Sequence, residues 1–463
     1  MKKFSFLLCA AALALATTLT SCSNEDNSYG PDDVVVRNGY KLTEIIEDAL
    51  EKYSSDEISV SLPDTVTLFL DDNFIQIPEG KTVTLVGNEN APARLNMSKS
   101  FNIDGNLTIK NMDITAKMDA YNPFVASATE NNTIVFEGVT VKGLNGDLIP
   151  WFALEGTTFS FIGCDIDKTN IYVNNAIVVK DSKIKLTNSI YIENPSLLTV
   201  ENTEFDAEAA NPALFVLGSN PGEKNEKGIY VIEEPIVLKG IKATNINGGI
   251  ISAYPWDSNV KYVIKDMQIE DCVFGLNPQW GFNAVVDFSN GGILNFSIKN
   301  STVYNISEAN NCTYFTKYNN SIVPDNAGLP ADDVVAGVWS WTYTNNTFYK
   351  VATGQWHNGG RIAQKCSLMD VDIENNLWYD CATNGSGILR RLFGGNKNTG
   401  NFHTAVVNGN TWVQHDATGK ATFEDASSYN RTDGVDVKYD PQFANPLEGD
   451  FTSGAENGDP RWK

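Results

Sequence analysis

One pattern recurs eleven times in this sequence and limits what the chain can fold into. Each copy is a short β-branched segment interrupted by one Asn, Asp or Gly, which we call the anchor. The anchors are Asn111, Gly138, Gly163, Asp181, Asn202, Gly240, Asp271, Asn300, Asn345, Asn375 and Gly409. The residues two positions before and three positions after the anchor are apolar in every copy, and those four positions before it are apolar as well. With 42% hydrophobic residues overall, chance would not produce three unbroken apolar columns.

The pattern indicates a strand, a one-residue bend and a second strand. Positions −4 and −2 point inward by the period of two of a β-strand. Asn, Asp and Gly tolerate the left-handed backbone that breaks the pleat, and position +3 re-enters the core. One such unit cannot bury its apolar side alone, but a stack of units can. The spacing between anchors varies from 18 to 45 residues, which suits stacked coils with unequal loops and not propeller blades.

Two further columns support this register. The position before the anchor reads Lys180, Glu201, Lys239, Glu270 and Lys299 in five successive repeats. Outward charges of alternating sign are what neighbouring strands should carry, although a binding strip is an alternative interpretation. The position after the anchor ends in Asn346, Asn376 and Asn410, which predicts a ladder of hydrogen-bonded amides. Trp341, Trp378 and Trp412 fall in the apolar columns and are expected in the core.

The two ends of the stack need caps, because an open terminal coil exposes unpaired strand edges. Leu42, Ile45, Ile46, Ala49, Leu50 and Tyr53 follow helical spacing, with Thr43 as the expected N-cap. Strand signals follow at 58–62, 66–70, 75–77 and 83–86. We therefore expect an N-terminal capping helix, a stack of coils over residues 38–419, and a turn-rich capping segment over 420–463 that wraps the final coil.

The first residues have the form of an export signal. Lys2 and Lys3 precede a short apolar run, and Leu19-Thr20-Ser21-Cys22 resembles a bacterial lipobox. We expect residues 1–21 to be a removable signal peptide, Cys22 to carry the lipid, and residues 22–37 to be a linker. The tetrad Ser23-Asn24-Glu25-Asp26 resembles the tag that sends lipoproteins of some Gram-negative gut bacteria to the cell surface. We therefore expect the protein to be an outer-membrane lipoprotein that is exposed at the cell surface.

Charge and cysteine content exclude several functions. The formal net charge is −23, and removing Lys2 and Lys3 with the signal gives −23 − 2 = −25 for the mature chain. Such a surface repels nucleic acid and anionic membranes. Five cysteines remain beyond Cys9 and Cys22, without CxxC spacing, so neither a disulfide framework nor a zinc site is indicated. We expect most of them to be buried free thiols.

The cap helix, the repeat and the asparagine ladder together resemble the right-handed parallel β-helix of the pectate-lyase-like superfamily, over about residues 38–463. The ending of the chain resembles that of uncharacterised β-helix lipoproteins encoded beside glycan-uptake systems in gut bacteria. Its segments are Asp440-Pro441-Gln442-Phe443, Gly449-Asp450-Phe451 and Gly458-Asp459-Pro460-Arg461-Trp462. The resemblance implies an all-β fold. It also implies that the partners of the protein are a polysaccharide, the outer membrane and components of a glycan transporter.

Some loop residues fit no core column and are candidates for binding. Trp256, Trp280 and Trp356 could stack on sugar rings or could pack within their own loops. Basic residues gather late in the chain, at His357, Arg361, Lys365, Arg390 and Arg391. They could bind a glycan, act in catalysis or be solvated loop charges.

Two functions follow from these residues. The first is non-catalytic capture of an extended polysaccharide, with Trp256, Trp280, Trp356, His357, Arg361, Arg390 and Arg391 as binding residues and no cofactor. The alternative is a polysaccharide lyase acting by β-elimination on a uronic-acid glycan. The resemblance implies a basic residue as catalytic base in that case, for which Arg361, Lys365 and Arg391 are the candidates, and a possible Ca²⁺ to neutralise the carboxylate. The sequence favours binding over cleavage.

Overall fold

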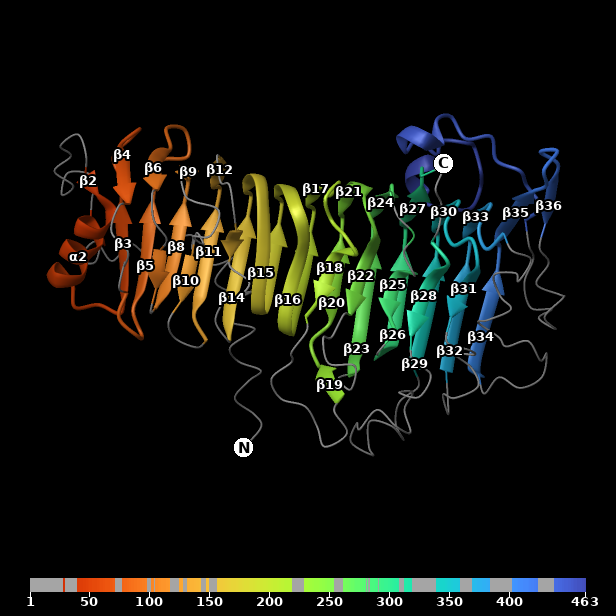
Figure 1. Cartoon of the computed structure of the whole chain (residues 1–463), viewed down its shortest axis with the longest axis horizontal. Coiled ribbons are helices and arrows are strands. Elements are labelled where there is room, and N and C mark those ends of the chain that lie inside the picture. Colours follow the sequence, from red (N-terminus) through yellow and green to blue (C-terminus); the bar gives the residue numbers. More distant parts are fainter. Residues whose placement is uncertain are drawn as a thin grey trace.

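The computed structural model shows an all-β chain arranged along one long axis (Figure 1). It describes residues 28–29, 40–70, 77–97, 101–103, 105–116, 125–127, 131–142, 147–149, 156–218, 229–253, 261–279, 281, 284–289, 291–307, 312–318, 339–358, 369–383, 402–423 and 437–463. Thirty-four strands of these segments join in one sheet that is parallel in all but one of its pairings, and β7 (Phe101–Ile103) and β10 (Val125–Ser127) form a separate parallel pair. No helix within these ranges is long and apolar enough to cross a membrane.

The anchors adopt the predicted backbone. All eleven have positive φ, between 48° and 67°. Each lies between the end of one strand and the start of the next, so the strands before and after the anchors form two separate series. The prediction of a bend at a residue that tolerates the left-handed conformation is confirmed.

The strands before the anchors pair in parallel, each with the equivalent strand of the next repeat, and we call them the pre-bend series. They are β3 (Glu57–Ser61), β5 (Thr82–Val86), β8 (Asn106–Lys110), β11 (Thr133–Glu137), β14 (Thr157–Ile162), the ends of β15 (Asp165–Lys180) and β16 (Lys183–Glu201), β20 (Ile236–Lys239), β23 (Lys261–Glu270), β26 (Gly291–Lys299), β29 (Trp339–Thr344), β32 (Met369–Glu374) and β34 (Phe402–Asn408). The two-residue strand β1 (Ser28–Tyr29) pairs with β3.

The strands after the anchors form a post-bend series with the same parallel pairing. They are β2 (Tyr40–Lys41), β4 (Thr67–Leu70), β6 (Ala93–Met97), β9 (Met112–Ala116), β12 (Thr140–Lys142), the starts of β15 and β16, β17 (Glu204–Asp206), β21 (Lys242–Ile246), β24 (Val273–Leu276), β27 (Thr302–Asn305), β30 (Thr347–Tyr349), β33 (Leu377–Tyr379) and β35 (Thr411–His415). The last strand, β36 (Ala421–Phe423), pairs antiparallel with β35.

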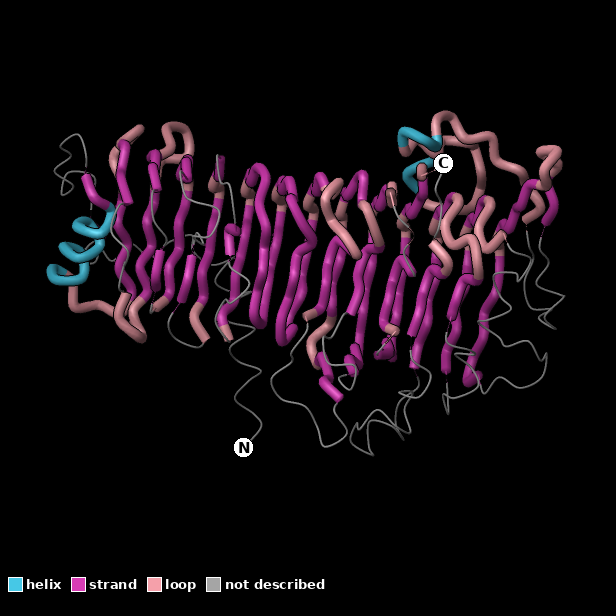
Figure 2. Tube along the Cα trace, viewed as in Figure 1, coloured by secondary structure: helices cyan, strands magenta, loops and turns pink. Residues whose placement is uncertain are grey.

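A third series completes the repeats from residue 147 onward. It comprises β13 (Asp147–Ile149), the middle parts of β15 and β16, β18 (Ala213–Leu217), β22 (Gly249–Ala253), β25 (Ala284–Phe288), β28 (Tyr314–Tyr318) and β31 (Gln355–Asn358). An extra strand, β19 (Ile229–Ile232), pairs with the start of β23. Figure 2 shows the strands of successive repeats side by side along the length of the molecule.

The core follows the predicted columns. Trp341, Trp378 and Trp412 are at most 3% exposed. The side chains of Asn346, Asn376 and Asn410 are fully buried and linked, with Nδ2 of Asn346 2.8 Å from Oδ1 of Asn376 and Nδ2 of Asn376 3.0 Å from Oδ1 of Asn410. The asparagine ladder is confirmed.

The outward column of alternating charge is also confirmed as a set of ion pairs. Lys180 Nζ lies 3.0 Å from Glu201 Oε2, and Lys239 Nζ lies 3.1 Å from Glu270 Oε2. These pairs join neighbouring repeats, as the structural interpretation of the column predicted.

Helix α2 (Leu42–Lys52) covers the first repeats with the expected apolar face, on which Leu42, Ile45, Ile46 and Ala49 are buried. The N-cap prediction is wrong. Lys41, and not Thr43, precedes the first turn, and no side chain caps it. Thr43 is 5% exposed and lies inside the helix, because the chain enters it directly from β2.

The C-terminal segment, residues 437–463, lies over the post-bend series and contains two short 3₁₀ helices, Pro446–Glu448 and Pro460–Trp462. It reaches further than the final coil that the sequence analysis expected. The backbone N–H of its first residue, Val437, donates to the carbonyl of Asn410, next to β35. Near the other end, the Arg461 side chain donates to the carbonyls of Asp271, Cys272 and Asn300. Figure 1 shows this segment, in blue, across the ends of β27, β30 and β33.

Candidate functional site

Most of the site residues predicted from sequence lie outside the described residues. This holds for Cys22, Trp256, Trp280, Arg361, Lys365, Arg390 and Arg391. His357 is placed by its backbone alone, in β31 opposite Thr316 of β28. The predictions for these residues therefore remain predictions.

Trp356 is a correction. The sequence predicts a loop residue here that either stacks on a sugar ring or packs within its own loop, but Trp356 lies in β31 and is 1% exposed. Its ring stacks on Phe315 of β28 with centroids 4.3 Å apart and planes 3° apart, and it meets Trp378 edge-on at 5.9 Å. No face is left for a sugar, so Trp356 is a core residue.

The described surface does contain a groove, on the post-bend series between β12 and β21. Its volume is about 560 Å³, and it is lined by Lys142, Asp165, Ile166, Asp167, Lys183, Ile184, Lys185, Glu204, Phe205, Asp206, Thr244 and Asn245. The apolar members Ile166, Ile184 and Phe205 are buried and form the floor. We call this feature the charged groove.

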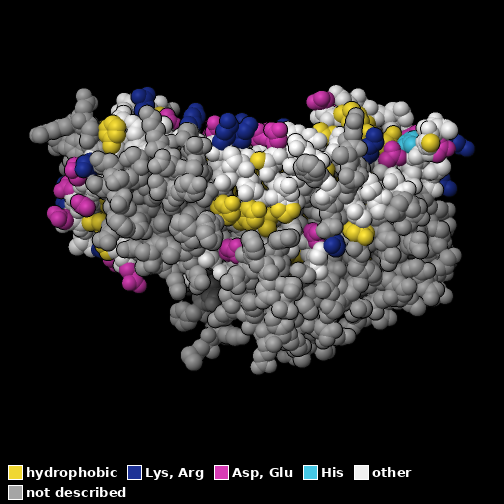
Figure 3. Space-filling view, in the orientation of Figure 1, with side chains coloured by type: hydrophobic (Ala, Val, Ile, Leu, Met, Phe, Trp, Pro, Cys, Tyr) yellow, Lys and Arg dark blue, Asp and Glu magenta, His cyan; other side chains and the backbone are white. Residues whose placement is uncertain are grey.

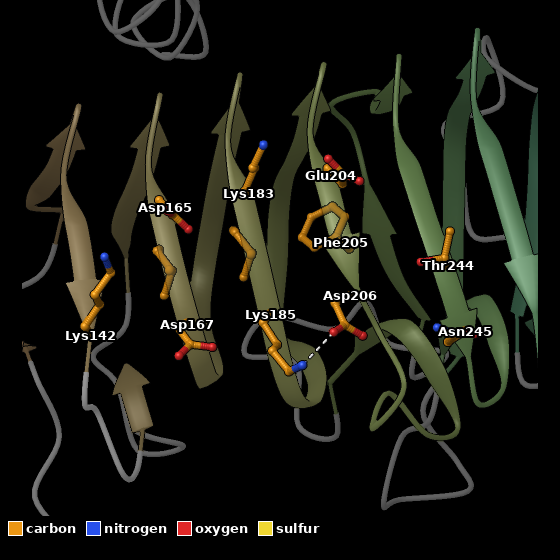
Figure 4. A pocket seen from close by; sticks show the side chains of 12 residues that line it. Lys142, Asp165, Asp167, Lys183, Lys185, Glu204, Phe205, Asp206, Thr244 and Asn245 are labelled. Atoms are coloured by element: carbon orange, nitrogen blue, oxygen red, sulfur yellow. Dashed lines mark ion pairs between the residues drawn. The ribbon is translucent and has the colours of Figure 1, made fainter.

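The strand register explains how the charged side chains of the groove are arranged. Positions +2 and +4 after each anchor point outward, on either side of the buried +3 residue. Asp165, Lys183 and Glu204 pair in register and form the first row, and Lys242 lies next in register beyond the lining residues. Lys185, Asp206 and Thr244 are in register in the second row, which Lys142 and Asp167 extend at the equivalent positions. Figure 4 shows both rows directed out of the sheet toward the viewer.

Ion pairs neutralise part of the groove. Lys185 Nζ lies 2.8 Å from Asp206 Oδ2, and the hydrogen bond to this carboxylate raises the pKa of Lys185. Lys242 Nζ lies 3.4 Å from Glu204 Oε1. Among the described residues, neither Lys142 nor Lys183 has an ion-pair partner. The groove therefore offers ammonium donors and carboxylate acceptors in alternation, which Figure 3 shows as adjacent blue and magenta side chains over the middle strands.

The C-terminal segment marks where this surface changes. Where the segment lies, the +4 positions carry Tyr304, Tyr349 and Tyr379, against which Phe443 and Phe451 pack. Polar contacts add to this packing, because Asn457 donates to Thr411 at 2.7 Å and the Trp462 indole to Thr302 at 2.7 Å. The +4 row therefore changes from aromatic under the segment to charged in the open groove.

Other groups in the described parts of the chain offer less chemistry. No three His, Cys, Asp or Glu side chains gather there in a way that could hold a metal ion. Cys164, Cys272, Cys312 and Cys381 are free and buried, as expected for most of the thiols. Burial raises the pKa of Cys164 to about 11 and that of Cys312 to about 12, so these thiols are poor nucleophiles.

The charged groove was not predicted from the sequence. The signal was present, since the +2 and +4 positions hold Asp165, Asp167, Lys183 and Lys185 in two successive repeats. Alternating charge also occurs at the −1 position, where it forms ion pairs. The sequence of one repeat does not distinguish these two cases. The pairing of neighbouring strands places the +2 and +4 residues in two rows, and these rows line the open groove.

Of the comparisons with known proteins, the one against family models gives a match, over part of the chain. Residues 164–306 match the profile of a domain of unknown function, DUF4957, and these residues contain every lining residue of the charged groove except Lys142. No curated protein and no solved structure matches the chain. The chain is thus similar over residues 164–306 to a family whose function is itself undefined.

Proposed function

We propose that this protein is a non-catalytic lipoprotein that binds an extended polysaccharide along the charged groove. The observation that carries the proposal is the groove itself, an open surface across five consecutive post-bend strands with donors and acceptors in alternation. Sugar hydroxyls donate and accept hydrogen bonds, so they can satisfy both kinds of side chain. Neighbouring strands lie about 4.8 Å apart, so a polymer running along the axis would meet a new pair of side chains at each step.

The charge of the groove favours a neutral or weakly charged glycan. Its lining has three Lys against four Asp and Glu, a sum of 3 − 4 = −1. The whole chain has a net charge of −23. A polyanionic glycan would be repelled at long range without a compensating positive surface in the groove. Binding should therefore depend little on ionic strength.

A second part of the proposal concerns how the three strand series are arranged around the core. We propose that the pre-bend, post-bend and third series are the three faces of a right-handed parallel β-helix, with α2 as its N-terminal cap. The parallel pairing of each strand with the equivalent strand of the next repeat supports this. A crystal structure would test it directly, and a left-handed or open arrangement of the three series would contradict it.

Affinity gel electrophoresis tests the binding function. The purified mature chain should be retarded by at least one neutral polysaccharide from a panel. Lys183→Ala should reduce that retardation several-fold, because Lys183 has no ion-pair partner in the described structure and its ammonium group remains available to a ligand. Lys239→Ala is the matched control, since Lys239 is an exposed strand lysine paired to Glu270 outside the groove. Equal loss in both variants, or none in either, would contradict binding at the groove.

The same preparation separates binding from cleavage. β-Elimination creates a C=C bond that absorbs in the ultraviolet, so polyuronates should be tested with and without Ca²⁺. We expect no absorbance to develop. Absorbance that is lost in Arg361→Ala or Arg391→Ala would establish the lyase function instead.

We also propose the cellular address that the first residues indicate. Cys22→Ala should release the protein from membranes, and protease added to intact cells should digest the native form. A variant that still sediments with outer membranes would contradict lipidation at Cys22. Full protection from protease would place the protein on the inner side of the outer membrane, away from extracellular glycan.

A further inference from the structure

A histidine holds the start of the C-terminal segment. His415 is the last residue of β35, and its side chain is 15% exposed. Its Nδ1 lies 3.0 Å from Oδ1 of Asp380, which follows β33. Its Nε2 lies 3.2 Å from Oδ1 of Asp440, which belongs to the C-terminal segment. The ring thus bridges the sheet and the segment.

This geometry defines the protonation state of the ring. Both ring nitrogens face a carboxylate oxygen, and an ionised carboxylate only accepts hydrogen bonds. A neutral imidazole has one N–H, so one of the two contacts would set a lone pair against a lone pair. The imidazolium form has two N–H groups and satisfies both contacts.

The other charged groups near the ring favour the same form. Asp416 is the next residue along the chain. Hydrogen bonds from the Thr418 hydroxyl and from the backbone N–H groups of Lys420 and Thr418 lower the pKa of its carboxyl, and the positive charge of His415 adds a small contribution. The ring of Tyr379 lies 4.7 Å from the imidazole, centroid to centroid. Burial by itself lowers the pKa of His415, but the hydrogen bonds and negative charges of Asp380 and Asp440 outweigh it, so that the pKa is raised above 6.5.

We infer that His415 is a pH-dependent latch that holds the first residues of the C-terminal segment onto the last repeats when it is protonated and releases them when it is neutral. Neighbouring contacts make the release local. Val437 keeps its bonds to Asn410 and to the Thr411 hydroxyl, and the far end keeps the bonds of Asn457 and Arg461. The residues freed are those around Asp440, between Val437 and Phe443. This inference is independent of the proposed glycan function.

Two measurements on the mature chain test the latch. The chain has three histidines, so ¹³C-histidine NMR can follow each ring. His415 should titrate above 6.5, and Asp440→Asn should shift its pKa downward. Hydrogen exchange read by mass spectrometry, corrected for the intrinsic pH dependence of exchange, should show protection of residues 438–442 falling by about tenfold or more between pH 6 and pH 9.

Matched variants distinguish a latch from a merely structural side chain. In His415→Gln the protection of residues 438–442 should no longer change with pH. His403 lies in β34, in the pre-bend series, and His403→Gln should behave as the native chain. Titration of His415 at or below 6.5 would overturn the inference. So would a native exchange profile that is flat with pH, or one that His415→Gln leaves unchanged.

Discussion

Nδ2 of Asn346 lies 2.8 Å from Oδ1 of Asn376, and the same oxygen accepts the backbone N–H of Asn346 at 3.0 Å. The relation repeats one step on, where Oδ1 of Asn410 accepts from the backbone N–H and Nδ2 of Asn376. The side-chain oxygen of each buried amide thereby accepts hydrogen bonds from the backbone N–H and the side chain of the ladder residue in the preceding repeat. The loops of these repeats differ in length, but the ladder keeps their strands in register. A shift of one residue between neighbouring strands would separate the amides and break these hydrogen bonds.

The ladder leads to the first prediction. Asn376→Ala should lower the free energy of unfolding by about 3 kcal/mol, because it leaves two buried donors of Asn346 without this acceptor. Urea denaturation measures the loss. Asn96→Ala, in a half-exposed outward position of β6, is the control and should cost less than about 0.5 kcal/mol. Similar values for the two variants would mean that the ladder contributes little.

Trp356→Ala gives the second prediction. The ring is buried between Phe315, Phe348 and Trp378, so its removal should cost about 3–5 kcal/mol in unfolding free energy. Glycan retention by the fraction that remains folded should be unchanged. If stability were preserved and retention lost, Trp356 would be a surface residue and the register of β31 would be wrong.

The third prediction concerns the anchors. Asp271 has φ of +56°, which glycine adopts freely and a β-branched residue does not. Asp271→Val should therefore be less stable than Asp271→Gly by about 1–2 kcal/mol. Thermal or urea unfolding of the two variants side by side measures the difference. Equal stabilities would show that the bend relaxes and that its left-handed conformation is not required.

Buried thiols allow a fourth prediction. Burial raises the pKa of Cys272 and Cys312 to about 12 each, so almost no thiolate exists at neutral pH. Iodoacetamide at pH 8 should leave Cys164, Cys272, Cys312 and Cys381 unmodified in the native chain and alkylate them in denaturant. Peptide mapping by mass spectrometry reads each site. Rapid native labelling of Cys272 would mean that the C-terminal segment, whose Arg461 bonds its carbonyl, opens easily.

Sequence reasoning reached the bends, the core columns and the ladder because they depend on local rules. Strand periodicity and the backbone preference of Asn, Asp and Gly fix these positions relative to the anchor. The burial of Trp356 was not predicted, because the number of residues between the anchor and the third-series strand differs from one repeat to the next. Phe315 lies 15 residues after Asn300, whereas its stacking partner Trp356 lies 11 residues after Asn345. Unequal loops remove the column that would have marked both residues as core.

The path of the C-terminal segment was beyond sequence reasoning for a different reason. It depends on contacts between residues far apart, such as Phe451 with Tyr304 and Asp459 with Thr302. No periodicity links these pairs. The position of the charged groove could not be predicted either, because its rows form only when neighbouring strands pair in register.

The last prediction is the effect of pH on stability through His415. Its folded-state pKa is raised above the ordinary value of 6.5, so the folded chain binds the proton more tightly than the unfolded chain does. The stabilisation is fully present below pH 6.5 and is lost as the pH rises through the folded-state pKa. Each unit of difference between the two pKa values corresponds to about 1.4 kcal/mol. The difference in unfolding free energy between the native chain and His415→Gln should therefore be largest near pH 6 and shrink toward pH 9. Urea denaturation at intervals across this range measures it, with His403→Gln as the reference. A difference that grows with pH would show that the neutral ring is the form that the fold prefers.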